Sequence, residues 1–165
     1  MTCPSCLSPE AVLGTQCPAS PTDVFTFTEV VVNGSVVLPA PKPDIEHITN
    51  VTTNFDLNDV EVLDVNLGGP APVTGRKVIV AGTLNLGVEY SAAEPSQEVH
   101  YAQFDLPFKA MIKQRPCTMN RGLLPADFDI SAYNIRVCIE HQQYHIISPR
   151  EISKVIVVLV WLEPK

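Results

Sequence analysis

The five cysteines are the residues of this chain best suited to chemistry: Cys3, Cys6, Cys17, Cys117 and Cys138. Three of them lie in the opening segment MTCPSCLSPEAVLGTQCP. A cysteine thiolate can bind zinc, exchange disulfides in redox chemistry or form a structural disulfide. Because five is an odd number, at least one thiol must stay free or bond to another molecule.

Cys3 and Cys6 form a CxxC motif, which is typical of both zinc sites and thiol redox sites. A structural zinc site needs four ligands, and only Cys17 follows nearby. His141 and His145 have suitable mutual spacing, but we expect them in a turn and strand as exposed polar side chains. A redox motif needs a helix N-terminus in a βαβ unit, and the sequence pattern predicts neither a helix nor a βαβ unit. We therefore predict no metal and no cofactor.

The remaining sequence offers no catalytic template. It lacks a G-x-S-x-G elbow, a P-loop and an H-E-x-x-H motif. His100 falls on the apolar face of its segment, which favours a hydrogen-bonded histidine at the edge of the core over a general base. We predict no catalytic residues, although an enzyme with a site assembled from distant residues stays open as a third hypothesis.

Composition narrows the class of protein. A length of 165 residues is typical of one domain, and 45% hydrophobic residues, rich in valine and isoleucine, favour packed β-structure. A net charge of -7 without a basic cluster argues against binding nucleic acid or anionic lipid. The longest apolar run, VIVVLVWL, is too short to span a bilayer. No signal-peptide pattern is present, so we expect synthesis in a cytosol.

The chain divides into an extended arm and a β-rich body. Residues 1–21 are rich in Pro, Ser and Cys without periodicity, and we predict a connector arm followed by one domain at 22–165. Asn33-Gly34 predicts a two-residue hairpin turn. Ile45–Leu57 and the segment VEVLDVNL are expected as two separate strands.

Period-2 alternation identifies the main strands. It runs through KVIVAGTLNLGVEY and HYAQFDLPFKAMI, where Pro107 indicates an edge or a bulge. In Tyr133–Ile139 it places Cys138 on the polar face, away from the core. Ile152–Leu162 is apolar on both faces, as expected of a central or covered strand. The pattern predicts an all-β, antiparallel β-sandwich with jelly-roll-like character.

Thiols outside the core are well placed for bonds between subunits. An extended arm can also add a strand to the open sheet edge of a neighbour. A repeated contact of this kind that does not close on itself produces a filament or a layer. Intramolecular bridges, or cysteines that stay reduced, remain the alternative.

Three segments resemble the SPOCS domain of spore coat and spore morphogenesis proteins from endospore-forming Firmicutes. They are KVIVAGTLNLGVEYSA, EVHYAQFDLPFKAMI and YNIRVCIEHQQYHIISPREISKVIVVLV, within a resemblance from about Asp44 to the C-terminus. The resemblance implies a structural or scaffolding role at the spore surface and supplies no catalytic residues. The LysM module of better-known members is not visible. The arm is similar in layout to the connectors of endospore appendage subunits, whose cysteines cross-link stacked subunits.

We therefore expect a self-assembling structural subunit of the spore coat, exosporium or an appendage fibre, made in the mother-cell cytosol. Cys3, Cys6 and Cys17 would cross-link it to Cys117 and Cys138 of other subunits. Its main partner would be itself, with other coat proteins as further candidates. The rival hypothesis is a binding module that docks a coat protein or a cell-wall glycan, with cysteines intramolecular or zinc-bound.

Overall fold

The computed structural model of this chain describes residues 11–13, 17, 26–112 and 122–165. Its elements are β1 (Ala11–Leu13), β2 (Phe27–Val37), β3 (Ile45–Leu67), β4 (Val73–Ala92), β5 (Val99–Ile112), the 3-10 turn η1 (Ile130–Ala132), β6 (Tyr133–Ser148) and β7 (Glu151–Pro164). Within those ranges no helix is long and apolar enough to cross a membrane.

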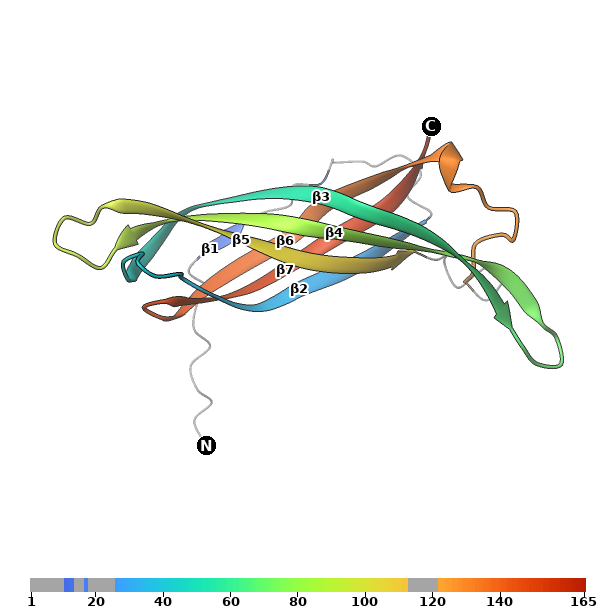
Figure 1. The fold of residues 1–165 in the computed structure, drawn as a ribbon, viewed down its shortest axis with the longest axis horizontal. Helices are drawn as coiled ribbons and strands as arrows, with labels where there is room; N and C mark the ends of the chain where they lie inside the picture. Colours follow the sequence, from blue (N-terminus) through green and yellow to red (C-terminus); the bar gives the residue numbers. More distant parts are fainter. Residues whose placement is uncertain (1–10, 14–16, 18–25, 113–121) are drawn as a thin grey trace.

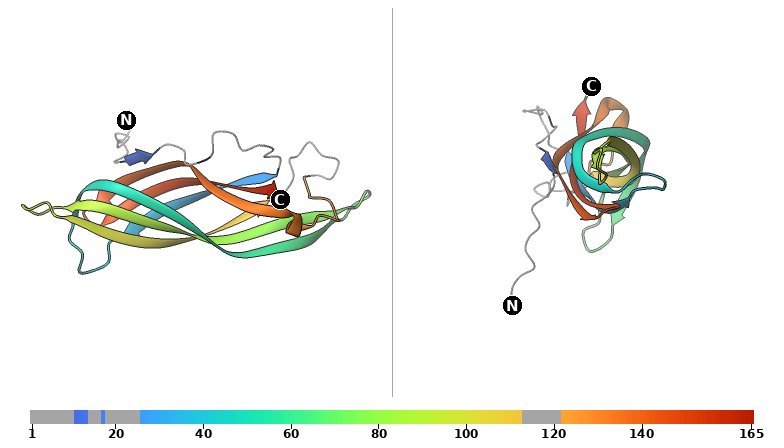
Figure 2. Two further views of the ribbon diagram at one scale, coloured as in Figure 1. Left: turned by 90° about the horizontal axis from the view of Figure 1, so that it is seen from above. Right: turned by 90° about the vertical axis from the view of Figure 1, so that its left-hand side faces the viewer.

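The strands form two antiparallel sheets that pack face to face. One sheet has the order β1-β6-β7-β2 and the other has the order β3-β4-β5. The chain passes from one sheet to the other after β2 and again after β5, and the two sheets curve around a common interior (Figures 1 and 2). The predicted all-β, antiparallel sandwich is confirmed.

The core lies between the sheets, as the alternation predicts. Val80, Leu84 and Leu86 of β4 are fully buried, and Ile156 and Val158 of β7 are buried opposite to them. Because successive side chains of a strand point to opposite faces, each of these strands contributes every second residue to the core. β7 is the strand with two apolar faces, and it lies centrally between β6 and β2.

The hairpin predicted at Asn33-Gly34 is wrong. The segment is one strand that pairs with β7 from Phe27↔Trp161 to Val37↔Glu151, so the continuous ladder prevails over the turn dipeptide. Gly34 adopts a φ of +106° inside this strand. It faces Lys154, which is buried and donates from Nζ to the Asn33 carbonyl at 3.4 Å. Burial lowers the pKa of Lys154.

β3 also differs from the prediction, because the two expected strands are one strand of 23 residues. It pairs with β4 along its length, and the register shifts between Leu57 and Asp59. Such a shift resets the faces of the strand, which explains the broken alternation in the sequence. The β3–β4 hairpin extends past the end of the sandwich (Figure 1).

Pro107 lies on an edge strand, as predicted. β5 is the outer strand of its sheet, and Pro107 pairs with Thr83 of β4. The next residue, Phe108, packs its ring over Gly82, where a Cβ would lie 2.8 Å from the ring. Phe55 contacts the same ring edge-on, with centroids 5.9 Å apart. This aromatic pair joins all three strands of the sheet.

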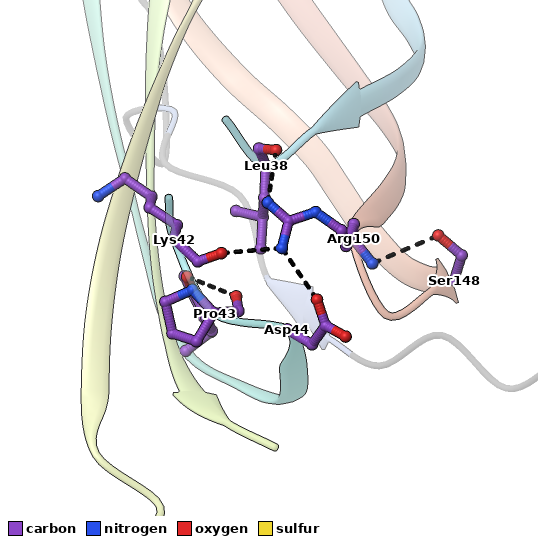
Figure 3. A network of polar contacts seen from close by, with 7 residues as sticks. Leu38, Lys42, Pro43, Asp44, Ser148 and Arg150 are labelled. Carbon is purple, nitrogen blue, oxygen red and sulfur yellow. Dashed lines mark hydrogen bonds and ion pairs between the residues drawn. The ribbon is translucent and has the colours of Figure 1, made fainter. Parts of the chain in front are cut away.

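One arginine ties the two sheets together at the end where β2 leads into β3. Arg150 donates from its guanidinium to the carbonyls of Leu38 and Lys42 at 3.2 and 2.8 Å, and to the Asp44 carboxylate at 2.9 Å (Figure 3). Its own carbonyl accepts from the Leu38 amide at 2.8 Å. We call these contacts the Arg150 clamp, because they hold the crossover segment against the β6–β7 turn.

Candidate assembly site

Part of the predicted arm is a strand of the sandwich. β1 pairs antiparallel with the edge of β6, with Ala11 opposite Tyr144 and Leu13 opposite Gln142. The side chain of Leu13 is half-buried and packs against the main core. The arm therefore satisfies backbone groups of an exposed sheet edge within its own chain.

A small apolar cluster covers the outer face of the same sheet. Cys138, Leu159 and Trp161 are buried there, with exposed fractions of 6–7%, and Cys17 and Phe27 pack against them. We call these five residues the outer patch. Cys138 pairs with Leu159, and Phe27 pairs with Trp161, so the patch spans three neighbouring strands. Cys17 and Phe27 of the same chain therefore cover the part of the second apolar face of β7 that holds Leu159 and Trp161.

A disulfide joins Cys17 to Cys138 across the outer patch, over a sequence separation of 121 residues. Both residues were expected in bonds between subunits, and the structure instead pairs them within one chain. The reason is the docking of β1 on β6, which brings Cys17 over the outer face of that sheet. Cys138 does point away from the core, as the alternation predicts, but it is buried instead of exposed.

Two carboxylates lie beside this patch. Glu29 pairs with Leu159 of the patch, and Glu140 lies where the register of β6 shifts between Ile139 and His141. Burial raises the pKa of Glu140, and the neighbouring Glu29 raises it further through its charge and a hydrogen bond. Folding therefore makes Glu140 easier to protonate than it is in the unfolded chain.

The raised pKa gives a testable pH dependence. A carboxyl group with a raised folded pKa contributes stability below its usual pKa of 4.5, and that stability is lost as the pH rises through the folded value. We expect Glu140→Gln to unfold at a higher temperature than the wild type at pH 7, with the difference shrinking towards pH 4. Glu61→Gln, at an exposed glutamate of β3, is the control. An equal difference at both pH values would contradict this assignment.

The other predicted residues are placed as follows. Cys3, Cys6 and Cys117 lie outside the described residues. His141 and His145 both lie in β6 and are half-buried, so the expected strand is confirmed, whereas the expected turn and exposed side chains are wrong. Across the described ranges, no three His, Cys, Asp or Glu side chains are grouped to hold a metal ion.

Some contacts of the site were not predicted from the sequence. Phe27 and Trp161 of the outer patch were not singled out, although the two apolar faces of Ile152–Leu162 signalled that something covers this strand. No sequence signal indicated which segment would do so, because the arm has no periodicity of its own.

Comparison with known families identifies the domain. The family model described as SipL, SPOCS domain, matches residues 44–147. The chain belongs to the SPOCS domain family. Membership places it among spore coat and spore morphogenesis proteins, with a structural role associated with the spore coat. No curated protein and no solved structure matches it.

The family match begins where the resemblance predicted and covers β3 to β6, including Cys138. The arm with β1 and Cys17 lies outside it. The disulfide therefore fastens a segment that the family pattern lacks to a strand of the SPOCS domain.

Proposed function

We propose that this SPOCS protein is a self-assembling structural subunit of a spore surface layer or appendage, with an anchored arm that cross-links neighbouring subunits. The observation that carries the proposal is the docking of the arm: β1 adds to the edge of β6, and Cys17 is bonded to Cys138. These contacts hold β1 and Cys17 on the domain and leave Cys3 and Cys6 to form the bonds to other copies.

The docking of β1 and Cys17 on the domain changes the role expected of each cysteine. With Cys17 and Cys138 bonded to each other, the remaining thiols are Cys3, Cys6 and Cys117. Three thiols cannot all pair within one chain, so complete oxidation requires at least one bond to another molecule. Cys3 and Cys6 precede Ala11 by eight and five residues, so fully extended they reach at most roughly 30 and 20 Å beyond it.

Sheet edges supply the non-covalent part of the assembly. β2 forms the edge opposite to β1, and it carries Val31 and Val37 with exposed fractions of 53 and 60%. An exposed edge with apolar side chains is a template for pairing with another chain. A contact between β2 of one copy and a different edge of the next is heterologous and propagates into a fibre or layer.

The test uses controlled oxidation of the purified chain. We expect the wild type to give a ladder of covalent oligomers on a non-reducing denaturing gel, and the ladder to collapse with reductant. The triple variant Cys3→Ser, Cys6→Ser, Cys117→Ser should run as a monomer and keep the Cys17–Cys138 bond, which peptide mass spectrometry detects. Negative-stain micrographs of the oxidised wild type should show fibres or sheets.

Two outcomes would overturn the proposal. One is a wild type that stays monomeric and without particles after oxidation. The other is a triple variant that forms the same covalent ladder as the wild type, because the links would then run through Cys17 or Cys138. The double variant Cys3→Ser, Cys6→Ser separates the arm from Cys117 as the source of the links.

A further inference from the structure

The sheet on the side opposite to the arm has a polar hollow on its outer face. The hollow has a volume of about 370 Å³, and all three strands of the β3-β4-β5 sheet line it. Its principal polar residues are Asp56 of β3, Asn85 of β4, and Gln103 and Asp105 of β5. These residues alternate with Leu84, Leu86 and Leu106 of the core and with Phe55 and Phe104, which pack against it, so they face away from the core.

An aromatic ring forms one side of the hollow. Tyr101 of β5 is 45% exposed, although it is large and apolar over most of its surface. Its hydroxyl lies over Gly87, where a Cβ would be only 2.3 Å from Oη and 2.4 Å from Oγ1 of Thr52. The phenol therefore extends across the strand towards β3, and the glycine provides the space that this position requires.

Two of the polar groups hold each other in place. Asn85 donates from Nδ2 to the Asp56 carboxylate at 2.6 Å, and Asn85 pairs directly with Asp105 across the strands. Gln103 pairs with Gly87 in the next row. All of these residues lie in paired strands, so the sheet and not a loop sets the spacing of their backbones.

This combination of groups suits a sugar. A pyranose ring has an apolar C–H face that can stack on an aromatic ring, and hydroxyls that both donate and accept hydrogen bonds. Asp56 and Asp105 offer acceptors, while the amides of Asn85 and Gln103 offer donors and acceptors. The two carboxylates disfavour anionic polymers, and no metal-binding group of three is found among the described residues.

We propose that this hollow binds a neutral oligosaccharide, with one pyranose ring stacked on Tyr101 and its hydroxyls bonded to Asp56, Asn85 and Asp105. The site lies on the other sheet from β1 and the Cys17–Cys138 bond. The hollow contains no cysteine, so substitutions in it leave every thiol available for covalent assembly. A subunit with both features joins its neighbours through its thiols and holds a glycan on the β3-β4-β5 sheet.

The test is a calorimetric titration of the full chain with the hexamers of N-acetylglucosamine and of glucose, and with an oligogalacturonate as the acidic probe. We expect one of the neutral hexamers to bind and the acidic probe not to bind. Tyr101→Ala should weaken binding by about tenfold or more, whereas Tyr101→Phe, which keeps the ring, should stay within about threefold.

The matched control is Met111→Ala, which removes another exposed apolar side chain from the outer face of β5, outside the hollow. It should leave the affinity unchanged. The proposal is overturned if neither neutral hexamer binds at millimolar concentration, if only the acidic probe binds, or if Tyr101→Ala binds as tightly as the wild type. Covalent oligomers of Tyr101→Ala on oxidation should match those of the wild type, which separates this proposal from the assembly proposal.

Discussion

Replacing Cys138 with alanine is expected to lower the free energy of unfolding by about 4 kcal/mol, the largest effect that we expect of a single substitution outside the core. The Cys17–Cys138 bond closes a loop with a sequence separation of 121 residues, and cross-links over long loops restrict the unfolded chain most. Alanine avoids placing an unpaired hydroxyl against Leu159 and Trp161.

The measurement is urea denaturation, made in the Cys3→Ser, Cys6→Ser, Cys117→Ser background so that covalent oligomers do not interfere. Cys17→Ala is the matched partner. Cys17→Ala, Cys138→Ala and the double variant should lower the free energy of unfolding by the same amount, because each removes the same bond. Reductant should destabilise the background protein to that level and leave the alanine variants unaffected. A loss below about 1 kcal/mol in each variant would contradict a native bond between these residues.

Replacing Arg150 with methionine is expected to cost about 2 kcal/mol, because the Arg150 clamp loses its charged hydrogen bonds to three separate acceptors. The side chain of Arg150 is 37% exposed, so water replaces part of each lost contact. Arg150→Lys should recover less than half of the loss, since an ammonium does not reproduce the planar fork that reaches Leu38, Lys42 and Asp44 together.

The control for this prediction is Arg136→Met. Arg136 makes one ion pair with Glu163 at 2.6 Å, and both side chains are exposed to solvent. We expect it to change stability by less than about 1 kcal/mol, the usual range for a surface pair. Equal losses for the two methionine variants would show that the Arg150 clamp acts as an ordinary surface contact. Chemical denaturation of all three variants and the wild type makes the comparison.

The large loss of stability expected without the Arg150 clamp follows from its position in the fold. It connects the β6–β7 turn to the segment that carries the chain from one sheet to the other, and the Ile45 amide donates to the Pro149 carbonyl at 2.7 Å in the same place. These hydrogen bonds join one sheet to the other, and they are not part of the ladder of either sheet. Loss of the clamp should therefore loosen the packing of the sandwich more than the pairing within each sheet.

Much of the fold was predictable from local pattern. The alternation in Lys77–Tyr90 and His100–Ile112 identified the core faces of β4 and β5, because the backbone of a strand sends neighbouring side chains to opposite sides. The same rule oriented Cys138 away from the core. The family was also predictable, because its characteristic residues lie in these strands, and the match over 44–147 confirms it.

Local pattern failed where pairing with a distant strand decided the outcome. Asn33-Gly34 favours a turn by itself, yet β7 offers a partner for the whole of β2, and the added ladder hydrogen bonds outweigh that preference. The break near Leu57 in β3 looked like a strand end, and it is a shift of register against β4.

Three properties of this protein follow from its residues alone: an odd set of five thiols, strands with defined inner faces, and a SPOCS domain. The positions of the reactive and binding groups depend on the fold. Cys17 meets Cys138 because β1 docks on β6, and Tyr101 lies across Gly87 because β4 and β5 pair in one register. Both contacts join residues whose local sequences contain no information about each other, so only the pairing of distant strands determines them.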